Sequence, residues 1–200
     1  MKLRYSPTSP YVRKVVVTAL ELGIDGRIER IATNTADPAN GLAADNPLAK
    51  VPALLTDDIG PLYDSPVICE YLDSLQGAPK LHPAAGPARW VALRRQALAD
   101  GMTDAAILRR LEEMRPQGEQ SPSWIVKQQA KVEAVLDALE REAASFAKDP
   151  GIDQIAVGCA LGYLDFRYAA DRWRDRRPAL ARWFDAFARR PSMATTAPKG

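Results

Sequence analysis

A serine stands directly before a proline where a short apolar strand pattern gives way to a helical one. Ser9 precedes Pro10, and apolar residues recur after them at helical spacing. Proline is favoured at the first helical position because its missing N–H would be unpaired there anyway, so Ser9 is the predicted N-cap. A helix start offers free amide donors and a positive dipole end, which favour an anion such as a thiolate or carboxylate. Taken alone, such a dipeptide most often does no more than cap a helix.

The first 76 residues alternate strand and helix patterns around this serine. The predicted elements are a strand at 2–5, a helix at 10–23 ending at the good C-cap Gly23, a strand at 27–31, a loop with one irregular helical turn at 33–47, strands at 51–56 and 61–63, and a helix from Ser65. Ser65-Pro66 repeats the opening pair and predicts a second serine cap.

A segment rich in Gly and Pro, residues 77–87, separates this part from an all-helical remainder. The predicted domains are therefore residues 1–77 and 86–200. The later helices are expected at 88–114, from Ser121-Pro122, at 152–169 and from Arg177-Pro178, with a loosely held tail from Pro191. The helix at 152–169 is apolar on almost every side, which predicts the buried centre of a bundle. The fold class is α/β plus all-α, with a ligand site expected in a cleft between the two parts.

The composition is that of an ordinary globular protein, with 46% hydrophobic and 26% charged residues. The 27 basic and 25 acidic side chains nearly cancel, so charge gives no case for nucleic acid or for an anionic membrane. No apolar run approaches the roughly 20 residues that span a bilayer, and the N-terminus lacks a signal-peptide core. Cys69 and Cys159 lie in apolar helical patterns, which indicates buried thiols in a reducing compartment and neither a disulfide nor a metal site. We expect a cytoplasmic protein without a metal.

Three stretches together resemble a known family: Ser9 to Lys14, Asn46 to Leu54, and Leu62 to Leu72. Their order and spacing, followed by an all-helical half, are similar to those of the cytosolic glutathione transferase superfamily, and most similar to its small bacterial Ser-type enzymes. The resemblance spans nearly the whole chain. It implies the GST fold, an N-terminal thioredoxin-like domain followed by a C-terminal helical bundle, and a homodimer.

The resemblance also implies a glutathione site. Val51-Pro52 is expected to have a cis peptide bond, with the Val51 N–H and C=O pairing with the cysteinyl backbone of glutathione as an added strand would. Ser65 and the helix N–H groups would hold the γ-glutamyl carboxylate, Asp64 would balance the amino group, and Lys50 could reach the glycyl carboxylate. Each has a plainer interpretation: a proline that opens a strand, a helix cap, and a solvated lysine.

In this arrangement the glutathione thiol lies near Ser9. A free thiol has a pKa of ~8.5, so only a few per cent is thiolate at neutral pH. A hydroxyl that donates to sulfur, with the helix N-terminus, could lower that pKa by about one or two units, and each unit needs about 1.4 kcal/mol. Ser9 is then a thiolate stabiliser; Thr8 could share or take the role, and Tyr5 is a more distant candidate. A serine cannot form a mixed disulfide, which argues against glutaredoxin-like chemistry.

The implied activity is attack of the glutathione thiolate on a small hydrophobic electrophile, typical of detoxification, with a possible peroxidase side activity. The electrophile is expected near Tyr11, Met102 and Asp104, and Asp100 and Asp104 could line the cleft or reach a partner subunit's glutathione. Two alternatives stay open: a non-catalytic glutathione-binding or protein-interaction member of the fold, comparable to the stringent-starvation regulators, and a dehalogenase or isomerase that uses glutathione as a cofactor.

The remaining conspicuous residues receive structural interpretations. His82, the only histidine, is expected at the surface of the linker, and Arg172 to Arg177 on a solvated face. Gly101 would mark a close approach of another backbone. The four tryptophans are expected to be packing groups: Trp90, Trp124, Trp173 and Trp183. Gly151 and Gln154 replace the usual cap and acid of the family's central helix, and Gln154 can still reach back to the cap amide.

Overall fold

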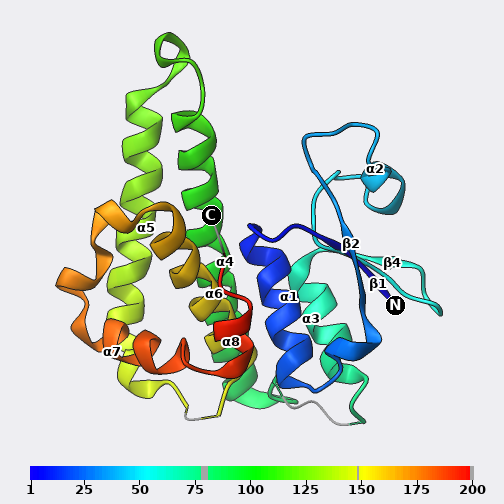
Figure 1. The fold of residues 1–200 in the computed structure, drawn as a ribbon. Helices are drawn as coiled ribbons and strands as arrows, with labels where there is room; N and C mark the ends of the chain where they lie inside the picture. Colours follow the sequence, from blue (N-terminus) through cyan, green and yellow to red (C-terminus); the bar gives the residue numbers. More distant parts are fainter. Residues whose placement is uncertain (78–80, 148, 199–200) are drawn as a thin grey trace. The chain divides into compact units, whose positions relative to one another are not determined.

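The computed structural model describes residues 1–77, 81–147 and 149–198 (Figure 1). Two compact units emerge, one of Met1–Arg89 with Pro191–Gly200 and the other of Trp90–Arg190. Of the predicted linker at 77–87, Ala78-Pro79-Lys80 lies outside the described residues. The domain boundaries at 77 and 86 stay a prediction.

The first unit is built on a four-stranded mixed sheet of order β2-β1-β3-β4. The strands are β1 (Lys2–Tyr5), β2 (Glu29–Ala32), β3 (Ala53–Leu55) and β4 (Pro61–Leu62). β1 runs parallel to β2 and antiparallel to β3, and β3 and β4 form the predicted hairpin. Leu3 pairs with Leu54, and both side chains are buried, which places the centre of the sheet in the core of the unit.

Helices complete this unit. They are α1 (Pro10–Glu21), α2 (Leu42–Asp45), α3 (Ser65–Ser74) and α8 (Pro191–Thr195). α1 packs against α3 and α8, and α3 packs against β3 (Figure 1). α2 is the single helical turn expected in the loop at 33–47, and Gly23 follows α1 with a φ of +71°, a conformation that suits glycine.

The predicted loose tail is wrong. α8 buries Ser192 and Met193, and the Met193 carbonyl accepts a hydrogen bond from Arg13 of α1 at 3.0 Å. Ser192 also donates to the Glu21 carboxylate at the other end of α1. The tail is ordered by partners about 180 residues earlier in the chain, which no local pattern reveals.

The second unit is helical, as predicted. Its helices are α4 (Gly86–Glu113, whose first four residues belong to the first unit), α5 (Pro122–Glu142), α6 (Ile152–Arg167) and α7 (Pro178–Phe187). Every residue from Ile152 to Leu164 is buried, which confirms α6 as a central helix. The Gln154 side chain accepts the Gly151 N–H at 2.7 Å, so the altered cap of α6 works as predicted.

Two arginines of this unit are buried in ion pairs that the sequence did not indicate. Arg177 is only 1% exposed, not solvated, because its guanidinium donates to Glu133 and Asp137 of α5 at 2.7 and 2.6 Å. Arg95 of α4 likewise donates to Glu142 at the end of α5 and to Asp153 of α6, at 2.6 and 3.3 Å. These ion pairs join helices that are distant in sequence.

Two expectations about packing also need correction. Trp173 is buried and Trp183 stacks on Phe187, as packing groups do, but Trp90 is 69% exposed and Trp124 is 38% exposed. Gly101 has open space where a side chain would be, so no backbone of the described chain approaches it closely. Within the described residues, no helix combines the length and the apolar character needed to cross a membrane.

Candidate functional site

Ser9 is the N-cap of α1, as predicted. Its Oγ accepts the N–H of Val12 at 3.3 Å, and its own N–H donates to the Ser6 carbonyl at 3.2 Å, which closes the β1–α1 loop into a turn. The hydroxyl oxygen is thus an acceptor, while its hydrogen has no acceptor within the described chain. That hydrogen can be donated to a ligand at the positive end of α1.

Tyr5 directly precedes the same loop, and Thr8 lies within it. The Thr8 side chain is half-buried beside Ser9, and its hydroxyl makes no hydrogen bond to the described residues. Tyr5 ends β1, and its ring lies under the guanidinium of Arg30, 5.6 Å from the ring centre. Of the three hydroxyls, only that of Ser9 is fixed to the helix start.

The Val51–Pro52 peptide bond is cis, as the resemblance implies. Val51 lies just outside β3, and neither its N–H nor its C=O has a hydrogen-bond partner in the described part of the chain. An extended peptide could therefore pair with this residue without displacing an existing bond.

Asn46 fixes the turn that leads to Val51, a role that sequence reasoning missed. The Asn46 side chain is buried; its Nδ2 donates to the Lys50 carbonyl at 2.8 Å and its Oδ1 accepts the Leu48 N–H at 3.0 Å. Ala49 in this turn has a φ of +50°, in the left-handed region. Lys50 itself is exposed, so its ammonium is free to move toward an anion.

The second serine is placed slightly differently from the prediction. α3 begins at Ser65, and Asp64 occupies the cap position without a side-chain capping bond, so Ser65 is not the N-cap. Ser65 is only 2% exposed, whereas Asp64 is exposed, and the Tyr63–Asp64 peptide bond is cis. Because no side chain caps α3, its first N–H groups are available to a ligand.

Sheet topology brings these three loops to one end of the first unit. β1 and β3 are antiparallel, with Arg4 opposite Ala53, so the end of β1 lies beside the start of β3. β3 and β4 are antiparallel, with Leu54 opposite Leu62, so the end of β4 lies there too. The loops that carry Ser9, Val51 and Ser65 therefore leave the sheet at the same end.

The residues predicted for the electrophile are divided between the units. Tyr11 lies on α1 in the first unit and is half-buried. Met102 and Asp104 lie on α4 in the second unit, where Met102 is fully buried and Asp104 is exposed. Their common role stays a prediction.

His82 is buried, not at the surface as expected. Its Nδ1 lies 2.9 Å from Asp73 Oδ2, and the same carboxylate accepts the backbone N–H groups of Leu81 and His82 at 2.8–3.1 Å. Asp73 near the end of α3 thereby fixes the segment that follows the linker. The role of His82 is structural. It depends on a contact with Asp73 of α3, which cannot be inferred from the sequence of the linker.

Comparison with known proteins agrees with this geometry. Residues 8–75 match the glutathione S-transferase N-terminal domain and residues 90–186 match the glutathione S-transferase C-terminal domain. The chain is 37% identical over 202 residues to the uncharacterized GST-like protein YibF of Escherichia coli (strain K12), covering 99% of this chain and 98% of that protein.

Two solved structures are also similar to this chain over nearly its whole length. A glutathione S-transferase from Methylobacillus flagellatus, solved with glutathione bound, is 42% identical, with a TM-score of 0.93 and 99% of each chain covered. A glutathione transferase family member from Pseudomonas fluorescens Pf-5, solved with S-(propanoic acid)-glutathione, is 41% identical, with a TM-score of 0.91 and all of both chains covered. This chain belongs to the cytosolic glutathione S-transferase superfamily.

Proposed function

We propose that this protein is a glutathione transferase in which Ser9 holds glutathione as a thiolate. The observation that carries the proposal is the Ser9 hydroxyl, which caps α1 with its oxygen and keeps its hydrogen for a ligand. A charge-assisted hydrogen bond to sulfur and the positive helix end both favour the anion over the thiol. Thr8, the adjacent hydroxyl, is the second candidate for the same contact.

The rest of glutathione would follow the other two loops. Its cysteinyl backbone pairs with the free N–H and C=O of Val51, presented by the cis bond to Pro52. Its γ-glutamyl carboxylate lies at the uncapped start of α3 by Ser65, with Asp64 beside the amino group. Lys50 provides a mobile charge for the glycyl carboxylate. The similar proteins solved with glutathione and its derivatives support this assignment.

The reaction is nucleophilic substitution or addition at a small electrophile. The thiolate donates its electron pair to an electrophilic carbon, and either a leaving group departs with its own pair or a proton is taken up at the neighbouring carbon. The bound S-(propanoic acid)-glutathione of the Pseudomonas fluorescens protein shows a glutathione substituted at sulfur, as this reaction would produce. The electrophile would lie near Tyr11, Met102 and Asp104, and we propose peroxide reduction by the same thiolate as a side activity.

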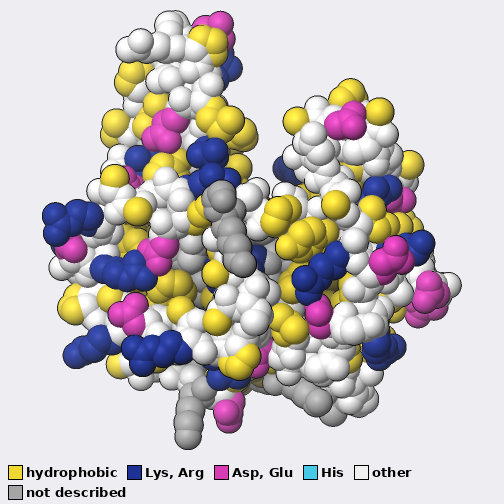
Figure 2. Space-filling model, viewed as in Figure 1, with side chains coloured by type: hydrophobic (Ala, Val, Ile, Leu, Met, Phe, Trp, Pro, Cys, Tyr) yellow, Lys and Arg dark blue, Asp and Glu magenta, His cyan; other side chains and the backbone are white. Residues whose placement is uncertain are grey.

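We also propose a cytoplasmic homodimer with domains at 1–77 and 86–200. Large apolar side chains are exposed where α4 ends and α5 begins, namely Leu108, Leu111, Met114, Trp124 and Val126. Figure 2 shows hydrophobic side chains on the surface of this hairpin. Exposed apolar groups gathered in this way favour association with another protein surface. Light scattering after gel filtration would measure the assembly directly.

Binding and turnover can be separated by two serine variants. Ser65→Ala should weaken glutathione binding about tenfold, measured by calorimetry, because a carboxylate loses one charge-assisted hydrogen bond. Ser9→Ala should retain binding but lose at least tenfold in kcat for 1-chloro-2,4-dinitrobenzene. Ser74→Ala, at the exposed end of α3, is the matched control and should change neither quantity. Binding without turnover in the wild type would instead favour the non-catalytic alternative.

A further inference from the structure

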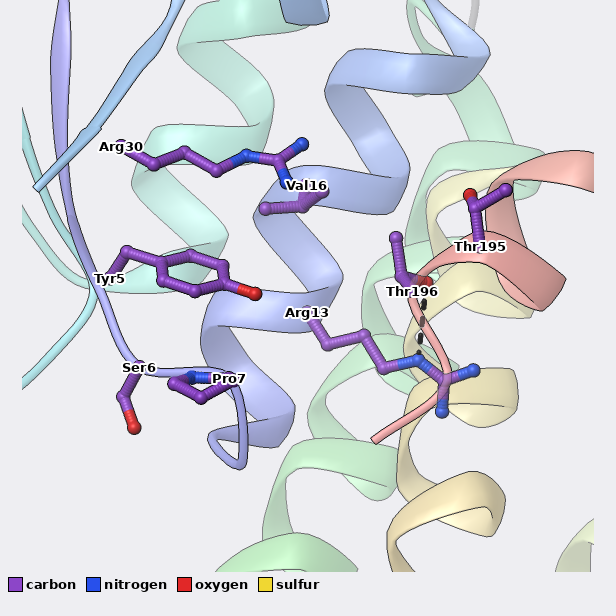
Figure 3. A pocket seen from close by; sticks show the side chains of 8 residues that line it. All are labelled: Tyr5, Ser6, Pro7, Arg13, Val16, Arg30, Thr195 and Thr196. Atoms are coloured by element: carbon purple, nitrogen blue, oxygen red, sulfur yellow. Dashed lines mark hydrogen bonds between the residues drawn. The ribbon is translucent and has the colours of Figure 1, made fainter. Parts of the chain in front are cut away.

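A pocket on the first unit carries two guanidinium groups and a phenol. It lies between β1, β2, α1 and α8 (Figure 3) and is lined by Tyr5, Ser6, Pro7, Arg13, Val16, Arg30, Thr195 and Thr196. We call it the acid pocket, because its basic side chains suit an organic acid as the ligand. Among these residues only Tyr5 is a candidate for the glutathione site, as a more distant stabiliser of the thiolate; the others were not predicted to bind glutathione or its electrophile.

Arg13 brings an unbalanced positive charge to the acid pocket. The residue is only 9% exposed, and its guanidinium donates to the Met193 carbonyl at 3.0 Å and to the Thr196 hydroxyl at 3.3 Å. Both acceptors are neutral, and no carboxylate within the described ranges lies at ion-pair distance. A buried cation without a counter-ion creates a positive potential that favours an anion nearby.

Arg30 and Tyr5 complete the polar wall. One Arg30 nitrogen is bound to Asp25 at 2.7 Å, and its guanidinium lies over the Tyr5 ring. In Figure 3 the Tyr5 hydroxyl points toward α1 and Arg13, while the Ser6 hydroxyl points away. That phenol donates to no group in the part of the chain that the structure describes, so its hydrogen is free. Among the residues that the structure describes, two guanidiniums and one carboxylate give the pocket a net positive charge.

The acid pocket adjoins the proposed site of the thiolate. Ser6 and Pro7 line it, and the Ser9 N–H is hydrogen-bonded to the Ser6 carbonyl, so the pocket begins within one turn of Ser9. We propose that the acid pocket binds the carboxylate of an electrophilic substrate while the thiolate at Ser9 attacks its reactive carbon. This inference rests on the proposed transferase function and names its substrate class, small organic acids with an electrophilic carbon.

A matched pair of substrates isolates the carboxylate. 4-Chloro-3-nitrobenzoate and 4-chloro-3-nitrobenzamide react alike: the thiolate sulfur forms a bond to the ring carbon, and chloride leaves with the bonding electrons. They differ in charge and little in shape. The wild type should have a kcat/KM about tenfold or more higher for the acid, after correction for the uncatalysed rates, because only the acid gains a charge-assisted contact.

Three variants assign that preference to the pocket. Arg30→Gln should lower kcat/KM for the acid severalfold and leave it nearly unchanged for the amide, and Tyr5→Phe should lower the ratio of the acid kcat/KM to the amide kcat/KM severalfold. Arg27→Gln is the control, since it removes one exposed positive charge three residues away without touching the pocket. Benzoate should inhibit turnover of the acid, and benzamide should not.

Failure of this inference can be told from failure of the proposed function. Turnover of the uncharged 1-chloro-2,4-dinitrobenzene reports the transferase activity alone. If that substrate reacts but the acid and the amide are used equally, or Arg27→Gln matches Arg30→Gln, the carboxylate pocket is refuted and the transferase remains. Inhibition by inorganic phosphate as strong as that by benzoate would also overturn it, because the pocket would then be a site for free anions.

Discussion

At the scale of single residues, Ser9 combines a structural and a chemical role because a hydroxyl both accepts and donates. Its oxygen accepts the Val12 N–H at the start of α1, which leaves the hydroxyl hydrogen available for another acceptor. Ser9→Ala would remove both the contact with the Val12 N–H and the contact with the ligand. If Ser9 served only as a helix cap, its loss would lower stability but would not change the chemistry of the ligand. The functional proposal therefore depends on the donor side of this hydroxyl.

Ala49 has a backbone conformation that is unfavourable for a residue with a side chain. Its φ of +50° costs an L-residue with a side chain roughly 1–2 kcal/mol, a cost that glycine avoids. Ala49→Gly should raise the free energy of unfolding by about 0.5–1 kcal/mol, after the greater entropy of glycine in the unfolded chain is subtracted. Urea denaturation measures the difference.

The same substitution in a helix is the control for Ala49. Ala97 is exposed within α4, where Ala97→Gly should lower stability by about 1 kcal/mol. If both variants lose stability equally, the turn at Ala49 is not strained.

At the scale of elements, one ion-pair cluster joins three helices. Glu142 of α5 binds Arg94 and Arg95 of α4, and Arg95 also binds Asp153 of α6. Burial alone would raise the pKa of Glu142, but hydrogen bonds from Arg95 and Arg94 outweigh burial, so this pKa lies below its ordinary value. A lowered pKa in the folded state means that the contact stabilises above the ordinary glutamate pKa and is lost as pH falls through the lowered value.

Glu142→Gln should therefore flatten the acid side of the stability curve. Between about pH 5 and pH 3, the wild type should lose more unfolding free energy than the variant, as measured by denaturation at each pH. Glu119→Gln, at an exposed ion pair with Arg115, should follow the wild type. A variant curve parallel to that of the wild type throughout this range would contradict the assigned role of Glu142.

The sequence was most informative where structure depends on neighbouring residues. Ser9-Pro10 and Ser121-Pro122 predicted helix starts because capping is a local hydrogen bond, which here is donated by the N–H groups of Val12 and Trp124.

His82 and Arg177 were expected at the surface because their partners, at positions 73, 133 and 137, are brought close only by folding. The three glutathione motifs were visible in sequence; the acid pocket was not, because Arg30 and Thr196 meet only in three dimensions.

At the scale of the whole molecule, the end of the chain belongs with its beginning. Residues from Pro191 join the first unit, and α8 packs on α1. Met193 is fully buried in α8, and its carbonyl holds Arg13. The tail is thus part of the unit that carries Ser9.

Met193→Ala should therefore destabilise the protein by about 2–4 kcal/mol, because a fully buried side chain is lost and leaves a cavity. Ala194→Ser, at the adjacent exposed position, should change stability by less than about 0.5 kcal/mol. Thermal and urea denaturation compare the two variants. Equal effects would show that α8 is not held as the structure indicates.

The most direct test of the central claim is the ultraviolet absorbance of bound glutathione titrated with pH. The wild type should show thiolate absorbance at neutral pH, with a thiol pKa about one or two units below ~8.5. Ser9→Ala should still bind glutathione but titrate near the free value, and Thr8→Val should titrate as the wild type does. If glutathione bound to the wild type remains a thiol at neutral pH, Ser9 does not stabilise a thiolate and the transferase proposal fails.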